Sequence, residues 1–394
     1  MATVEVNPDL LRWAIDRSGL SMEKLYKKFP KLDAWLAAEK PPTFRQLENF
    51  ARMTMTPFGV MFLNEPPEEK IPVPDFRTVS DDTIDRPSPD LSDTIQLMQL
   101  RQMWMREWLN EQGNESLAFI GSADVRRNPK SLAQEIRQTL DLAPEWAEQT
   151  SNWEAALTTL RRAMERIGIL VFSNSVVGLN NHRPLDPQEF RGFVLCDDIA
   201  PLVFVNDADS KSARMFTLAH ELVHLWIGTG GIFNLINMLP AKEPTERFCN
   251  EVAAEFLVPE FKLTEAWTKA QKVSDRFQLL AKQFKVSPVV VARRALDLKL
   301  ISKPEFFRFY EADRQDFLRR REQAKQIQKD KKSGPDFYTV QNARLGRPFS
   351  AAIVRATREG RILMREAYRL TGMKGQTFET YSERVLERVR NERE

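Results

Sequence analysis

Hydrophobic residues recur at helical spacing, in short bursts, between Pro8 and Leu63. Proline residues at positions 30, 41 and 42 separate the bursts. Ser21 and Thr43 stand directly before two of them, at positions where a helix N-cap is expected. The pattern predicts a bundle of four or five short helices.

The hydrophobic pattern becomes typical of strands further along the chain. Residues 169–173, 193–195 and 202–205 are rich in β-branched and aromatic side chains, and turn-prone stretches such as NNHRPLDP separate them. We expect a small sheet of about three strands. Amphipathic segments that precede it, at 91–110, 131–140 and 153–167, predict a layer of helices.

A buried helix is predicted directly after the sheet. From Lys211 to the stop at Gly228, apolar side chains surround the helix axis on all sides. His220, Glu221 and His224 lie within this segment, and a buried charge costs several kcal/mol unless it is paired or bound to a metal. Three residues before the helix can cap its N-terminus: Asn206, Asp207 and Asp209.

The spacing His-Glu-x-x-His fits a metal site. His220 and His224 are four positions apart, about 40° around a helix, so both imidazoles can bind one zinc ion. Glu221 lies about 100° from His220. Its carboxylate would stand next to the open coordination position and take a proton from water that the metal activates. Such a site hydrolyses amide bonds.

A catalytic zinc site needs a third protein ligand. The helix predicted from about residue 246 to 257 has an apolar arc with Glu246 and Asn250 at its edge, whereas Glu251 and Glu255 are expected on the opposite, solvated side. We therefore expect Glu246 to be the third ligand. Asn250, one turn later, can accept a hydrogen bond from a ligand imidazole and fix its tautomer.

His182 is the remaining histidine of the chain. It is a candidate for stabilising the oxyanion of the reaction, as extra histidines do in related zinc peptidases. A single histidine in a loop beside asparagine and arginine is more often a surface or structural residue, so both interpretations stay open.

The segments FTLAHELVHLWIG (216–228) and ERFCNEVAAEFLVP (246–259) resemble the ImmA/IrrE family of metallopeptidases. Members pair HExxH with a downstream glutamate in an E-x-x-A-N-type motif that ends in L-x-P. Here Cys249 replaces the usual alanine, a small residue for a small residue. The resemblance implies a gluzincin-like fold with the same three ligands and the same base. It also implies regulatory cleavage of a repressor or antitoxin-like protein.

The N-terminal bundle resembles the helix-turn-helix of xenobiotic-response-element-type repressors over about 55 residues. Its candidate recognition segment, KLDAWLAAEK (31–40), lacks the arginine, asparagine and glutamine side chains that read base edges. Contact with DNA and docking to a protein are both open for this module.

These patterns together predict a mostly helical α+β protein. Six segments are expected in order along the chain: a helix-turn-helix-like domain at 1–64, a proline-rich linker at 65–90, a zinc peptidase domain at 91–273 with its core at 169–259, a helix-turn-helix-like extension at 274–318, a charged linker at 319–336 and a small basic helical tail at 337–394.

Composition narrows the cellular setting. No apolar run approaches the roughly 18 residues that span a bilayer, and the N-terminus lacks the layout of a signal peptide. The chain has 2 cysteines, too few for a disulfide scaffold, which favours a reducing cytoplasm. A net charge of +3 excludes binding driven by strong overall positive charge but leaves room for local basic patches.

Two classes of function remain. The first is a regulatory zinc endopeptidase with one zinc ion per chain and a protein substrate. The second is a DNA-binding or antitoxin-type regulator whose metal site is not catalytic. A structural zinc site normally has four protein ligands, so three ligands with an adjacent Glu221 favour the enzyme.

Overall fold

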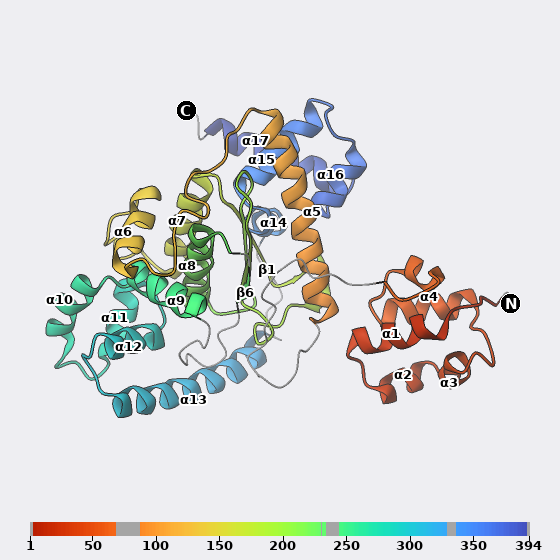
Figure 1. Ribbon diagram of the computed structural model, residues 1–394, viewed down its shortest axis with the longest axis horizontal. Helices are drawn as coiled ribbons and strands as arrows, with labels where there is room; N and C mark the ends of the chain where they lie inside the picture. The colour runs from red at the N-terminus through yellow and green to blue at the C-terminus, as the bar shows by residue number, and fades with distance from the viewer. Residues whose placement is uncertain (1–2, 68–86, 230, 234–243, 329–335, 392–394) are drawn as a thin grey trace. The chain divides into compact units, whose positions relative to one another are not determined.

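The computed structural model describes residues 3–67, 87–229, 231–233, 244–328 and 336–391 (Figure 1). The chain forms two compact units, residues 1–74 with 80–96, and residues 75–79 with 97–394. Most of the predicted proline-rich linker, residues 68–86, lies outside the described residues, as does the 329–335 part of the charged linker.

The first unit contains the short helices that the sequence predicts. They are α1 (Pro8–Ser18), α2 (Met22–Lys28), α3 (Leu32–Leu36), α4 (Phe44–Met53) and the 3-10 helix η1 (Phe58–Phe62). Thr43 forms a reciprocal capping box with Gln46, while Ser21 occupies the N-cap position of α2 without a side-chain cap. Phe29, Trp35 and Phe50 pack together in the core, with ring centroids 5.6 to 6.2 Å apart.

The second unit is built around a four-stranded sheet. Its order is β1-β5-β4-β6, with β1 parallel to β5 and the other neighbours antiparallel. The strands are β1 (Leu170–Asn174), β4 (Gly192–Leu195), β5 (Leu202–Asn206) and β6 (Gly231–Phe233). The three predicted strands are therefore β1, β4 and β5, and β6 is an additional strand at the edge.

The stretch predicted to be a turn around His182 is in fact a strand. β2 (Val176–Val177) and β3 (Asn180–Pro184) form a separate two-stranded antiparallel sheet. The side chains of β3 are mostly exposed. An exposed polar strand lacks the hydrophobic alternation on which the prediction depended.

Helices cover both faces of the larger sheet (Figure 1). Val171, Val194 and Val203 belong to the same core as α7 (Trp153–Arg166) and α8 (Lys211–Ile227). On the opposite face, Phe172 of β1 meets Phe349 with ring centroids 5.2 Å apart. The alternation of side chains along β1 explains why both faces are apolar.

The remaining helices extend this arrangement. They are α5 (Pro89–Glu111), α6 (Pro129–Thr139), α9 (Pro244–Leu257), α10 (Glu260–Ala270), α11 (Arg276–Phe284), α12 (Pro288–Asp297), α13 (Lys303–Gln328), α14 (Phe337–Leu345), α15 (Arg347–Arg358), α16 (Met364–Thr371) and α17 (Gln376–Asn391). The part of the predicted charged linker at 319–328 continues α13.

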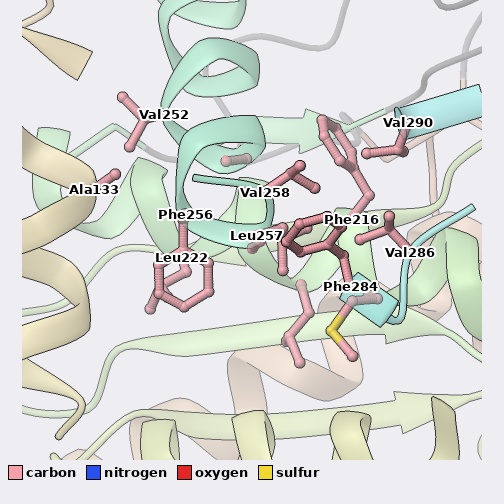
Figure 2. Close-up of a cluster of buried hydrophobic side chains, with 14 of the residues drawn as sticks. Ala133, Phe216, Leu222, Val252, Phe256, Leu257, Val258, Phe284, Val286 and Val290 are labelled. Atoms are coloured by element: carbon pink, nitrogen blue, oxygen red, sulfur yellow. The ribbon is translucent and has the colours of Figure 1, made fainter. Parts of the chain in front are cut away.

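A hydrophobic core joins α8 and α9 to the helices that follow them. Figure 2 shows Phe216 and Leu222 of α8 among Phe256 and Leu257 of α9, close to Phe284 at the end of α11. All of these side chains are buried. α11, α12 and the start of α13 thus pack into the same core as the helix that carries His220.

The predicted fold class, a mostly helical α+β protein with a small sheet, is confirmed. Among the described residues, no helix combines the length and apolar character needed to cross a bilayer.

Candidate metal centre

The helix α8 that carries the two close histidines is buried as the sequence predicts, from Met215 to Trp226. Its N-cap differs from the three candidates, because the side chain of Ser210 accepts a hydrogen bond from the backbone N–H of Ala213. Asn206 is instead the last residue of β5. The cap therefore stands directly before the first helical residue, as capping geometry requires.

The C-terminal end of α8 is closed by backbone contacts. Gly228 adopts a left-handed conformation with φ of 75°, and its N–H donates to the carbonyl of His224 at 2.9 Å. A Cβ atom at this position would lie 2.9 Å from the Cα of Gly121. The N–H groups of Gly121 and Ala123 donate to the carbonyls of Leu225 and Trp226. A second segment of chain thus holds the histidine-bearing turn in place.

Three side chains converge at one point beside α8. The Nε2 atoms of His220 and His224 are 3.0 Å apart. Each lies 3.2 Å from a carboxylate oxygen of Glu246, which stands in the first turn of α9. The structure therefore brings together two histidines and a glutamate from 22 residues further on, a group able to hold a metal ion.

The other ring nitrogens of the histidines also have partners. Nδ1 of His220 lies 3.1 Å from Oδ1 of Asn250, the residue expected to play this part. Nδ1 of His224 lies 3.1 Å from Oγ1 of Thr229. Each partner can accept a hydrogen bond from the Nδ1–H group. The lone pair of Nε2 then points toward the place where the three side chains meet, as a metal-binding imidazole requires.

Thr229 is a residue that the sequence reasoning missed. Its backbone N–H donates to the carbonyl of His224 at 3.2 Å, because the chain turns back at Gly228. The signal was present, since a residue directly after a helix-ending glycine returns to the last turn of the helix. A threonine at that position brings its hydroxyl to the histidine of that turn.

Glu221 is completely buried on the same helix. Neither carboxylate oxygen has a hydrogen-bond partner within the described residues. The carboxylate lies against β4, where a Cβ atom on Gly192 would be 3.2 Å from Oε1 of Glu221 and 2.6 Å from Cγ2 of Thr217. The absence of a side chain at Gly192 thus makes room for the carboxylate.

Burial and neighbouring charge shape the protonation of these groups. Burial lowers the pKa of His220 and favours the neutral imidazole, against the opposing effect of Glu246. Burial, followed by the negative charge of Glu246, raises the pKa of Glu221 well above its ordinary value. Burial alone would raise the pKa of Glu246, but the hydrogen bonds and charges of the two histidines outweigh it and lower that pKa.

The donor set fits a divalent cation. Four ligands about 2.0–2.1 Å from a zinc ion at tetrahedral angles are about 3.3 Å from one another, close to the 3.0 and 3.2 Å seen here. Two imidazoles and one carboxylate are also the ligand types of catalytic zinc sites. A cation would in addition compensate the buried carboxylate of Glu221, which has no other partner among the described residues.

The remaining predictions for the site differ in outcome. His182 is exposed on β3, and its backbone N–H donates to the side chain of Asn180 at 3.0 Å, so its role in the reaction stays a prediction. The placement of Glu255 on a solvated side of α9 is wrong. Its side chain is buried and forms an ion pair with Arg294 of α12. Glu251 is exposed as expected.

Comparisons with known proteins show which part of the chain is similar to a known family. Residues 164–296 match the model of a peptidase family described as the IrrE N-terminal-like domain. This segment holds the sheet from β1 to β6 and the helices from α8 to α12, and the match supports the resemblance to ImmA/IrrE metallopeptidases. Residues 345–384 match a domain of unknown function, DUF8813. No curated protein and no solved structure matches the chain.

The family match therefore indicates a metallopeptidase-like domain at residues 164–296. The matched segment contains His220, Glu221, His224 and Glu246. It extends past residue 273, where the peptidase domain was expected to end, and includes α11 and α12.

Proposed function

We propose that this chain is a zinc-dependent endopeptidase that hydrolyses a peptide bond in a partner protein. One observation carries the proposal: the ligand atoms of His220, His224 and Glu246 converge beside a buried carboxylate, Glu221, that has no partner among the described residues. A purely structural polar cluster would be expected to satisfy that carboxyl group, because a buried polar group without a hydrogen bond is costly.

The protein groups have distinct parts in this proposal. His220, His224 and Glu246 would hold one zinc ion, while Asn250 and Thr229 keep the imidazoles in the required tautomer. Bound zinc supplies a Lewis acid that polarises a carbonyl group and lowers the pKa of water. The carboxylate of Glu221 accepts a proton from the attacking water and returns it to the leaving nitrogen, as a general acid–base group does.

The substrate is proposed to bind as an extended peptide. β6 follows α8 closely and is one of the two edge strands of the four-stranded sheet in the described part of the chain, with β1 at the other edge. An extended peptide can add to such an edge through backbone hydrogen bonds. β4 and β5 are interior strands of this sheet, so both of their edges are already paired.

We infer the kind of substrate from the family resemblance. A repressor or antitoxin-like protein is the proposed substrate, and its cleavage would be regulatory. The N-terminal unit, with its helices α1 to α4, is proposed to localise the peptidase by contacting DNA or a protein.

The first test is metal content. Purified wild-type protein is expected to contain about one zinc per chain, and His220→Ala and Glu246→Ala are expected to lose it. Glu221→Gln should keep the metal and slow cleavage of a bound partner about 10²- to 10⁴-fold, so that it can be used to trap the substrate. Wild-type protein that binds no zinc after reconstitution would contradict the proposal and favour the DNA-binding regulator.

A further inference from the structure

A groove of about 720 Å³ lies between α5, α15 and α17, away from the residues of the metal centre. Figure 1 shows α15 and α17 beside the upper end of α5. The floor is apolar and is formed by Met105 and Trp108 of α5, Ala351 and Ala352 of α15, and Val385 and Leu386 of α17. The matched domain of unknown function supplies α15.

The groove follows one face of α15. Its lining residues Pro348, Ala351, Ala352 and Arg355 are spaced at i, i+3, i+4 and i+7, the positions that share a helix face. The lining extends from Pro348 to Glu359, about 16 Å along the axis at 1.5 Å per residue. Alanine side chains are too short to fill the space between the helices. The result is an elongated gap as long as about three helical turns.

Cationic side chains border this apolar gap. Arg355 pairs with Glu359 at 2.7 Å, but Arg358 and Arg390 are exposed and have no ion-pair partner within the described residues. These two arginines come from different helices, α15 and α17. The groove therefore presents uncompensated positive charge from two of its walls.

Trp108 lines the apolar floor of the groove and also contacts arginine side chains. It is only 7% exposed, and the guanidinium groups of Arg361 and Arg355 lie 4.7 and 5.8 Å from its ring centroid. Cation–π contacts of this kind hold arginine side chains in place. Tryptophan and arginine are also the residues that most often dominate binding energy at protein interfaces.

We propose that this groove binds an amphipathic helix of a partner protein, with an apolar stripe flanked by acidic residues. An elongated apolar gap between helices accepts the apolar face of a further helix. Arginines on two walls complement acidic residues on both edges of that stripe. The site is separate from peptide hydrolysis, so the proposal does not depend on the zinc chemistry.

Binding can be measured with the full chain and two designed helical peptides of about four turns. Both carry leucine and alanine at i, i+3, i+4 and i+7. One has glutamate at the flanking positions, and the other has lysine. Fluorescence anisotropy is expected to show binding of the glutamate peptide at least about tenfold tighter than that of the lysine peptide, a difference of about 1.4 kcal/mol.

Two variants test the place and the chemistry of binding. Arg358→Glu with Arg390→Glu should reverse the preference between the peptides. Ala351→Trp should abolish binding of both, because the new side chain fills the groove without changing charge. The matched control reverses two exposed arginines of α16 that do not line the groove, Arg365→Glu with Arg369→Glu, and should leave binding unchanged.

Three results would overturn the proposal. The first is that the glutamate peptide does not bind to wild-type protein that circular dichroism shows to be folded. Another is binding that Ala351→Trp leaves intact. The third is concentration-dependent dimerisation of the chain that Ala351→Trp abolishes, which would make a second copy the occupant of the groove.

Discussion

Glu221 and Glu255 are both buried glutamates on neighbouring helices, but their surroundings differ. Glu221 on α8 is 0% exposed, and its carboxylate has no hydrogen-bond partner among the described residues. Glu255 on α9 is 4% exposed and forms an ion pair with Arg294. Its carboxylate also accepts a hydrogen bond from the N–H of Glu260, at 3.3 and 3.4 Å from its two oxygens.

The difference separates a carboxyl group with a structural role from one that we propose to act on a ligand. The environment of Glu255 compensates its charge and ties the end of α9 to α12, because Arg294 also donates to the carbonyl of Val258 at 3.2 Å. Arg137 of α6 donates to the carbonyls of Glu255 and Phe256 and strengthens the same junction. Glu221 has no such compensation, which is the condition expected of a group that works on a ligand.

The largest expected effect comes from exchanging each carboxyl group for an amide. Glu221→Gln should reduce peptide hydrolysis about 10²- to 10⁴-fold, the contribution of a general acid–base group, while leaving the free energy of unfolding unchanged or higher. Glu255→Gln should keep the zinc site and lower the free energy of unfolding. Cleavage assays and urea denaturation of both variants check this. Equal loss of activity in both would remove the distinction.

The next largest effect is expected on stability, when the ion-pair partner of Glu255 is removed. Arg294→Met leaves a buried carboxylate uncompensated, which is expected to lower the free energy of unfolding by about 3–5 kcal/mol. Arg293→Ala, at the adjacent position on α12, removes a more exposed pair with Asp297 and should cost about 0–1 kcal/mol. A comparable cost for both variants in urea denaturation would show that the buried pair has no special weight.

Zinc should stabilise the part of the molecule around Glu221. At a free zinc concentration 100 times the Kd, the gain in free energy of unfolding is expected to be about 2.7 kcal/mol. Glu255→Gln should show the same gain, whereas His220→Ala should show none. Thermal melting with zinc and with a chelator measures this stabilisation. If zinc still stabilises His220→Ala, the zinc ion binds elsewhere.

The smallest expected effect concerns Thr229. Thr229→Val removes the hydroxyl that faces Nδ1 of His224 and should weaken zinc affinity about 10- to 100-fold. Thr229→Ser keeps the hydroxyl and serves as the control. Competition with a fluorescent chelator gives both affinities. An unchanged affinity in Thr229→Val would mean that the hydroxyl does not orient the imidazole.

The spacing of apolar and polar residues along the chain was sufficient to predict much of the fold and the residues that converge at the candidate metal centre. The i, i+4 spacing of His220 and His224 lies within one helix, and the apolar surroundings of that helix can be counted along the chain. Glu246 could be selected because it borders the apolar arc of its own helix. These features depend on a few consecutive turns, so no knowledge of distant contacts was needed.

Only the tertiary structure decided the features that depend on residues far apart in sequence. Glu255 appeared to belong to a solvated face because its partner, Arg294, stands 39 residues later on α12. β6 became a strand because β4 offers it backbone partners, and the exposed polar strand β3 exists through its pairing with β2. Helical spacing determines which residues share a face, but long-range packing determines whether that face meets water or another helix.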